Sequence, residues 1–112
     1  MTDTYICLGQ VSPAAGTLTT LYTVPTSTST TMSTLVISNV SSSGGATDMF
    51  RVSIAIGSVP DNISQYLYYD VNIGKQDTFC ATLGLTMAAG DVVRVQSANG
   101  TCTFQAFGIQ IT

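Results

Sequence analysis

Side chains that could do chemistry are few in this chain. Its 112 residues include six Asp, three Lys or Arg and three Cys, with no Glu, His or Trp. Without His, no side chain titrates near pH 7 in its ordinary environment. General acid–base catalysis needs such a proton carrier, and a thiol nucleophile needs a neighbouring base. The aspartates and Lys75 are each isolated in sequence, so we expect no enzyme activity, no catalytic residue and no cofactor.

The cysteine spacing does not predict a metal site. Cys7, Cys80 and Cys102 lie far apart, contain no Cys-x-x-Cys pair and are accompanied by no His, which excludes the common zinc patterns. We predict three reduced thiols, buried as small apolar side chains. One disulfide with a single free thiol is the alternative interpretation.

Oxygen ligands offer one further candidate for a metal. Asp70 and Asn72, with Asp77 shortly after them, could surround part of a Ca²⁺ ion. A polar strand end followed by a turn explains the same residues more simply. No metal site is therefore predicted.

Nucleic acid and membranes are not expected partners. The net charge is −3 and the three cations, Arg51, Lys75 and Arg94, are scattered, so no basic cluster could displace counterions from phosphates. The longest apolar runs are far below the ~20 residues that cross a bilayer. Residues 1–5 lack the pattern of a signal peptide, so we expect synthesis and folding in a cytoplasm.

Three tyrosines near the middle of the chain form its most distinctive cluster. Strict alternation along a strand would turn Tyr69 inward and leave Tyr66, Tyr68 and Asp70 on the opposite face. Exposed tyrosines often anchor interfaces, because each ring buries a large area at little entropic cost. We therefore predict Tyr5, Tyr66, Tyr68 and Asp70 as interface residues. Packing of that face beneath a loop of the same chain is the alternative.

The elements that carry these side chains are predicted to be strands. In the clearest case, Phe50, Val52, Ile54 and Ile56 share one face and Arg51 takes the other. No segment favours a long helix, because Gly or Pro interrupts each one. Eight strands are predicted, at residues 5–10, 18–24, 31–40, 49–57, 66–73, 77–83, 91–98 and 101–111. We expect a single all-β domain over residues 1–112, an antiparallel two-sheet sandwich with jelly-roll-like topology.

The predicted connections also have specific forms. Asn99 and Gly100 indicate a two-residue type I′ turn, and residues 89–91 a tight turn. Residues 41–46 are predicted to be a longer loop. The alternation in the last strand predicts a bulge or twist near Gly108. Residues 1–5 are expected to form an N-terminal arm that crosses onto a neighbour.

Low charge is the strongest functional signal in the composition. Charged residues make up 8% of the chain, against roughly a quarter in an ordinary soluble domain. A monomer covered mainly by uncharged side chains resists aggregation poorly. We therefore expect a building block that hides surface against its own copies, as a homotrimer, or against a larger assembly.

Several segments together resemble a known group of proteins. They are residues 21–25, 68–71, 77–79, 85–95 and 107–111. In their order and spacing they resemble small virion-associated proteins of tailed bacteriophages, often from aquatic and cyanobacterial hosts. The similarity runs from about Leu21 to Thr112. Gln110 stands where that group often has an acidic residue, and the group has no recognised catalytic residue to carry over.

The resemblance implies a structural part of a phage particle. The leading hypothesis is a capsid decoration (cement) protein, located on the capsid surface of the virion, which binds the assembled major capsid protein and stabilises the shell. A tail, neck or fibre component, including a host-binding adhesin module, is the alternative.

Overall fold

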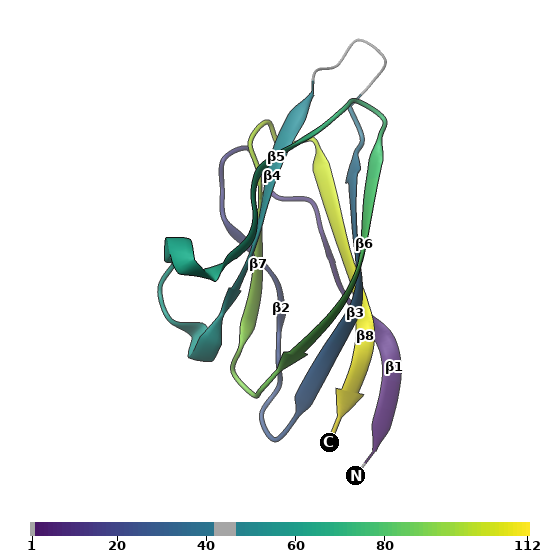
Figure 1. Ribbon diagram of the computed structural model, residues 1–112, viewed down its shortest axis with the longest axis vertical. Coiled ribbons are helices and arrows are strands. Elements are labelled where there is room, and N and C mark those ends of the chain that lie inside the picture. Colours follow the sequence, from purple (N-terminus) through teal and green to yellow (C-terminus); the bar gives the residue numbers. More distant parts are fainter. Residues whose placement is uncertain (1, 42–46) are drawn as a thin grey trace.

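The structure is a computed structural model that describes residues 2–41 and 47–112. The predicted loop at residues 41–46 lies outside the described residues except for its first position. Strands dominate the described part (Figure 1). In chain order the elements are β1 (Asp3–Val11), β2 (Thr19–Thr23), β3 (Ser29–Asn39), β4 (Asp48–Ala55), the 3₁₀ turns η1 (Ile56–Ser58) and η2 (Ile63–Gln65), β5 (Tyr66–Ile73), β6 (Thr78–Met87), β7 (Val92–Ser97) and β8 (Cys102–Ile111).

The strands form two antiparallel four-stranded sheets packed as a sandwich, which confirms the predicted fold class. One sheet has the order β1-β8-β3-β6 and the other β2-β7-β4-β5. Consecutive strands thus alternate between the sheets, except that β4 and β5 are neighbours in one sheet, which is the jelly-roll arrangement. Both ends of the chain lie at the same end of the sandwich (Figure 1), where Thr2 and Thr112 exchange backbone hydrogen bonds of 2.8 and 3.0 Å.

Aromatic rings hold the two sheets together. Phe50 of β4 is fully buried, and its ring centroid lies 6.4 Å from that of Phe104 of β8 and 5.6 Å from that of Phe79 of β6. Tyr68 of β5 joins the cluster, 5.4 Å from Phe79. Aliphatic side chains from both inner faces surround these rings. Burial of such side chains contributes roughly 1.5–3 kcal/mol each and is the main source of stability.

The structure has irregular pairing near Gly108, but the extra residues lie in β1 and β3, the two strands that flank β8. The pairing register shifts at Leu8 in β1 and at Ser33 in β3, on either side of Phe107. Strand β8 itself keeps one alternation throughout, with Cys102, Phe104, Ala106 and Gly108 buried. The predicted reversal of faces along β8 is therefore wrong, because the extra residues are inserted in the flanking strands.

Three other expectations need correction. Residues 3–5 are not a free arm, because they pair with β8 from Asp3 opposite Ile111 onward. Ile56 does not share the core face of β4; it lies in η1 with 73% of its surface exposed. Asn99 and Gly100 do not form a type I′ turn, because of the two only Gly100 has a positive φ, at 74°.

Candidate interaction surface

The tyrosine cluster lies on β5, where bulges change which side chains face the core. Val52 of β4 pairs with Tyr68 and Phe50 pairs with Val71, so two residues of β5 stand opposite one of β4. Within this bulge Asp70 has a φ of 54°, a conformation that Asp tolerates better than most residues. The bulge reverses the alternation. Tyr68 consequently packs against the core and Tyr69 is 48% exposed, the opposite of the predicted orientation.

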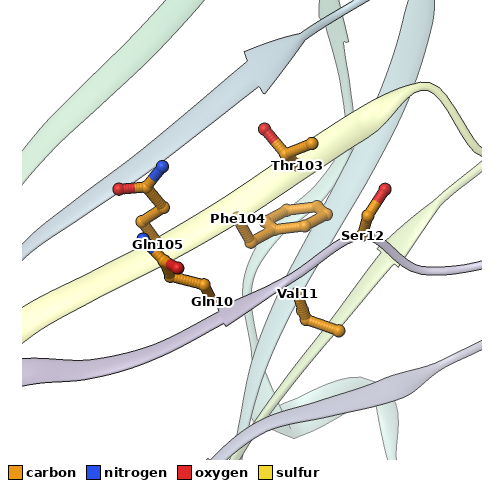
Figure 2. Close-up of a pocket in the computed structure, with 6 residues that line it drawn as sticks. All are labelled: Gln10, Val11, Ser12, Thr103, Phe104 and Gln105. Atoms are coloured by element: carbon orange, nitrogen blue, oxygen red, sulfur yellow. The ribbon is translucent and has the colours of Figure 1, made fainter.

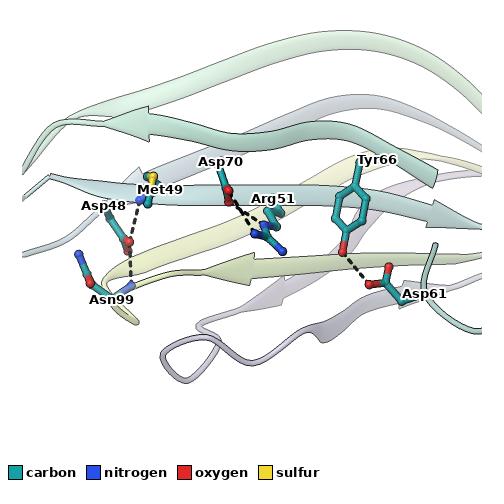
Figure 3. A network of polar contacts seen from close by, with 7 residues as sticks. All are labelled: Asp48, Met49, Arg51, Asp61, Tyr66, Asp70 and Asn99. Atoms are coloured by element: carbon teal, nitrogen blue, oxygen red, sulfur yellow. Dashed lines mark hydrogen bonds and ion pairs between the residues drawn. The ribbon is translucent and has the colours of Figure 1, made fainter. Parts of the chain in front are cut away.

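The exposed side of the bulge carries a compact polar and aromatic group (Figure 3). Arg51 donates two hydrogen bonds to Asp70, at 2.6 Å from Nε and 3.1 Å from Nη2. Its guanidinium carbon also lies 4.0 Å from the centre of the Tyr69 ring. The rings of Tyr66 and Tyr69 meet edge to face at 5.0 Å, and the Tyr66 hydroxyl donates to Asp61 at 2.9 Å. Arg51 and Asp70 thus neutralise each other, and Asp61 is held by the uncharged Tyr66 hydroxyl.

The ionisation of these groups follows from the same contacts. The hydrogen bonds from Arg51, followed by its charge, lower the pKa of Asp70. The bond to Asp70 in turn raises the pKa of Arg51. Burial, and then the hydrogen bond to Asp61, raises the pKa of Tyr66. All three groups therefore keep their charge state around neutral pH, so the cluster offers neither a general acid nor a general base there.

Of the four predicted interface residues, the structure brings only Tyr66 and Asp70 together at the surface. Tyr68 points into the core. Tyr5 lies on β1 in the other sheet and is 77% exposed. The group also contains Arg51, Asp61 and Tyr69. Alternation alone could not identify this group, because no local pattern in the sequence marks the bulge in β5.

The larger surface is the outer face of the β1-β8-β3-β6 sheet. Residues that pair directly across antiparallel strands point to the same side, so the register defines this face. One row runs from Cys7 through Phe107 and Thr34 to Thr82. We call the set of outward residues of these strands the uncharged face. It consists of Asp3, Tyr5, Cys7 and Gln10 (β1), Thr103, Gln105, Phe107, Ile109 and Ile111 (β8), Ser29, Thr31, Thr34, Val36 and Ser38 (β3), and Thr78, Cys80, Thr82 and Thr86 (β6).

Among these residues only Asp3, at one corner, carries a charge. The outer face of the opposite sheet differs, because it bears Arg51 and Arg94 on adjacent strands. Arg94 donates a hydrogen bond of 3.0 Å to the carbonyl oxygen of Val59. The few charges of the chain are thus distributed unevenly, and one broad face is almost free of them.

Two shallow hollows lie along β1 and β8. One is lined by Gln10, Val11, Ser12, Thr103, Phe104 and Gln105 and has a volume of about 370 Å³ (Figure 2). The other, of about 480 Å³, is lined by Tyr5, Ile6, Ser33, Phe107, Gly108 and Ile109. Neither lining contains an acid, a base or a thiol. Both linings consist of apolar and uncharged polar side chains.

A buried carboxylate, Asp48, lies at the start of β4 and has a structural role (Figure 3). Its Oδ1 accepts 2.8 Å hydrogen bonds from the backbone N–H groups of Met49 and Asn99. Its Oδ2 accepts from the hydroxyls of Ser97 and Thr101 and from the Thr101 N–H. Burial alone would raise the pKa of Asp48, but these bonds outweigh it and lower the pKa to about 2.

The cysteines are free thiols, and the predicted burial is wrong for two of them. Cys7 and Cys80 are exposed on the uncharged face, and only Cys102 is buried. Burial, together with the nearby charge of Asp48, raises the pKa of Cys102 to about 12.

In residues 2–41 and 47–112, no group of three or more Cys or Asp side chains is placed to hold a metal ion. The helical elements of the same residues are the two three-residue 3₁₀ turns, and neither could cross a membrane. No family model matches the chain. A comparison with curated proteins also finds no match.

Proposed function

We propose that this chain is a structural protein of the tailed-bacteriophage virion that decorates the outside of the capsid. In this role it binds the assembled major capsid protein as a homotrimer and stabilises the shell. Two things support the proposal: the resemblance in segment order from about Leu21 to Thr112, and the composition of the surface. The jelly-roll fold is compatible with it but occurs with many functions.

The uncharged face is the observation that carries the proposal. Burying charged side chains costs several kcal/mol per ion unless each finds a partner. A face built from Thr, Ser, Gln and apolar side chains avoids that cost. Depletion of charged side chains is typical of the centre of protein interfaces. This sheet is therefore well suited to lie against a large protein surface.

Stabilisation of the shell follows from mass action. A protein that binds the assembled lattice but not its dissociated subunits lowers the free energy of the assembled form. Binding as a trimer multiplies weak contacts, because the second and third contacts are intramolecular once the first is made. The mechanism needs no catalytic group, so the polar and aromatic group around Arg51 and Tyr66 is not required for it.

The number of copies per particle tests the proposal. A decoration protein is present in hundreds of copies, whereas a tail, neck or fibre component is present in roughly six to eighteen by the symmetry of those structures. Quantitative mass spectrometry or gel densitometry of purified particles, relative to the major capsid protein, measures this ratio. A ratio of a few hundredths would replace the decoration role with the tail, neck or fibre role. Absence from purified particles would overturn both.

A further inference from the structure

The two sheets differ in how their edges are protected. In the β2-β7-β4-β5 sheet, edge strand β2 is only five residues long and contains a register shift at Leu21. The other edge strand, β5, is bulged twice and carries Asp70. Short length, bulges and charges are the usual means of preventing edge-to-edge pairing. In contrast, β1 and β6 are nine and ten residues long, and Asp3 is their only charged residue.

The register identifies which backbone groups lie on the open side of β1. Thr2 and Thr112 exchange two hydrogen bonds, and such pairs alternate with non-bonded pairs along an antiparallel ladder. Thr4 and Ile6 therefore direct their N–H and C=O groups toward β8. The residues that direct these groups away from β8 are Asp3, Tyr5 and Cys7.

The same argument applies to β6. The Asn39 N–H donates to the Asp77 carbonyl oxygen at 2.9 Å, which fixes the alternation against β3. The N–H and C=O groups of Phe79 and Ala81 then face β3. The C=O groups of Thr78, Cys80 and Thr82 point to the open edge, as do the N–H groups of Cys80 and Thr82, whereas the Thr78 N–H donates to the Asp77 Oδ1 at 2.8 Å. Both edges thus offer an unbulged run of five residues, 3–7 and 78–82.

We propose that copies of this chain join edge to edge, β1 of one copy pairing antiparallel with β6 of the next. Adjacent strands of the sheet are antiparallel, so β1 and β6 at its two ends also run in opposite directions. A second copy in the same orientation therefore presents β6 antiparallel to β1. Tyr5 lies opposite Cys80 of the neighbouring copy, with Asp3 opposite Thr82 and Cys7 opposite Thr78. No like charges meet in this register.

This pairing uses two different surfaces, so it generates either a closed ring or an open filament. A ring satisfies both edges of every copy, whereas a two-fold contact of β1 with itself leaves β6 open. We expect three copies, which rests on the proposed homotrimer. The uncharged faces of the three copies then form one continuous surface around the three-fold axis.

Proline substitutions test the contact without disturbing the sheet of each copy. Tyr5→Pro and Cys80→Pro each remove an N–H that points away from the neighbouring strand, which an edge strand tolerates. Light scattering of the wild-type chain should give three times the 11.7 kDa mass of one chain, and either proline variant should give a single chain with an unchanged circular dichroism spectrum. The controls Tyr5→Ala and Cys80→Ala keep the N–H and should remain trimeric.

A thiol placed across the contact tests the register directly. In a Cys7→Ser background, Tyr5→Cys puts a thiol opposite Cys80 of the next copy, at the roughly 5.5 Å Cα separation of a directly opposed pair, within disulfide range. Mild oxidation should give a covalent trimer on a non-reducing gel. Adding Cys80→Ser should abolish that band.

The outcomes decide between arrangements. A wild-type monomer, or a trimer that neither proline affects, overturns the edge pairing. A covalent dimer that persists with Cys80→Ser shows β1 paired with itself and also overturns it. None of these results changes the number of copies per particle, so the copy-number measurement tests the decoration role separately.

Discussion

Asp48, the first residue of β4, accepts a hydrogen bond from the hydroxyl of Ser97, the last residue of β7, and both side chains are fully buried. Ser97 in turn accepts a hydrogen bond from the Cys102 N–H at 3.2 Å. The carboxylate therefore joins the start of one strand to both ends of the β7–β8 connection. Asn99 donates its N–H to this carboxylate, which explains why the Asn99–Gly100 pair does not adopt the two-residue turn that its sequence favours.

Replacing this carboxylate should be costly. Asp48→Asn turns one oxygen into an NH₂ group that must face at least two donors, from Met49 and Asn99 or from Ser97 and Thr101. We expect a loss of about 2–3 kcal/mol in the free energy of unfolding, since hydrogen bonds to a charged group are lost and buried donors are left unpaired. Urea denaturation measures it. The exposed Asp77→Asn, as a control, should change stability by less than about 0.5 kcal/mol.

The same residue should make stability depend on acidity. The pKa of Asp48 is about 2 in the folded chain against an ordinary 3.8, so the unfolded chain binds the proton more readily. The stabilisation is complete above pH 3.8 and is lost as the pH falls toward 2, by about 2 kcal/mol. Urea midpoints from pH 2 to 6 should show this slope in wild type and in Asp77→Asn. If Asp48→Asn retains the full slope, another carboxyl group is responsible.

Gly108 should be intolerant of a side chain. A Cβ at this position would overlap the carbonyl oxygen of Thr31 and come within 3.0 Å of the Cα of Met32. Backbone atoms cannot move aside cheaply, so Gly108→Ala should destabilise the fold by about 3 kcal/mol. Gly84→Ala is the matched control, because nothing lies within 4 Å of its added Cβ. Equal melting temperatures for the two variants would contradict the close approach of β8 and β3.

A charge placed on the uncharged face should block attachment to the shell. Thr34→Lys adds an ammonium group on the central strand β3 of this face, which a partner surface would have to desolvate. We expect at least a tenfold loss in binding to capsids stripped of the protein, measured by co-sedimentation. Gln96→Lys makes the same change beside Arg51 on the opposite sheet and should bind normally. A reversed result would assign docking to the β2-β7-β4-β5 sheet.

The reactivity of the cysteine thiols tests whether the uncharged face is covered on the particle, without any substitution. In the free protein, Cys7 and Cys80 should react with an aromatic disulfide reagent, and Cys102 only after unfolding, because it is buried and its pKa is raised to about 12. On assembled particles Cys7 and Cys80 should react at least tenfold more slowly. Unchanged reactivity of both thiols on the particle would show that this face remains open to solvent.

Much of the fold could be predicted from the sequence, because alternation and turn residues are local properties. The eight strands lie within a few residues of their predicted positions, except that β6 continues to Met87. A register shift at residues 83–84 interrupts its alternation opposite Ser33, so the alternating pattern in the sequence ends before the strand does.

The site was less predictable, because bulges depend on pairing with distant strands. The two extra residues in β5 place Tyr68 inside and Tyr69 outside, and nothing adjacent in sequence marks the left-handed conformation of Asp70. The uncharged face has the same origin. Low overall charge indicates that such a surface exists, but only the register of four strands shows that its members lie together.

The paired hydrogen bonds between Thr2 and Thr112 have a topological consequence. The two ends of the chain are therefore held side by side at one corner of the sandwich. A short linker between these two ends would allow circular permutation, with new termini in the turn where the Asp77 N–H bonds to the Gly74 carbonyl oxygen. Cargo fused to the permuted protein would then leave from the opposite end of the molecule, without altering either sheet.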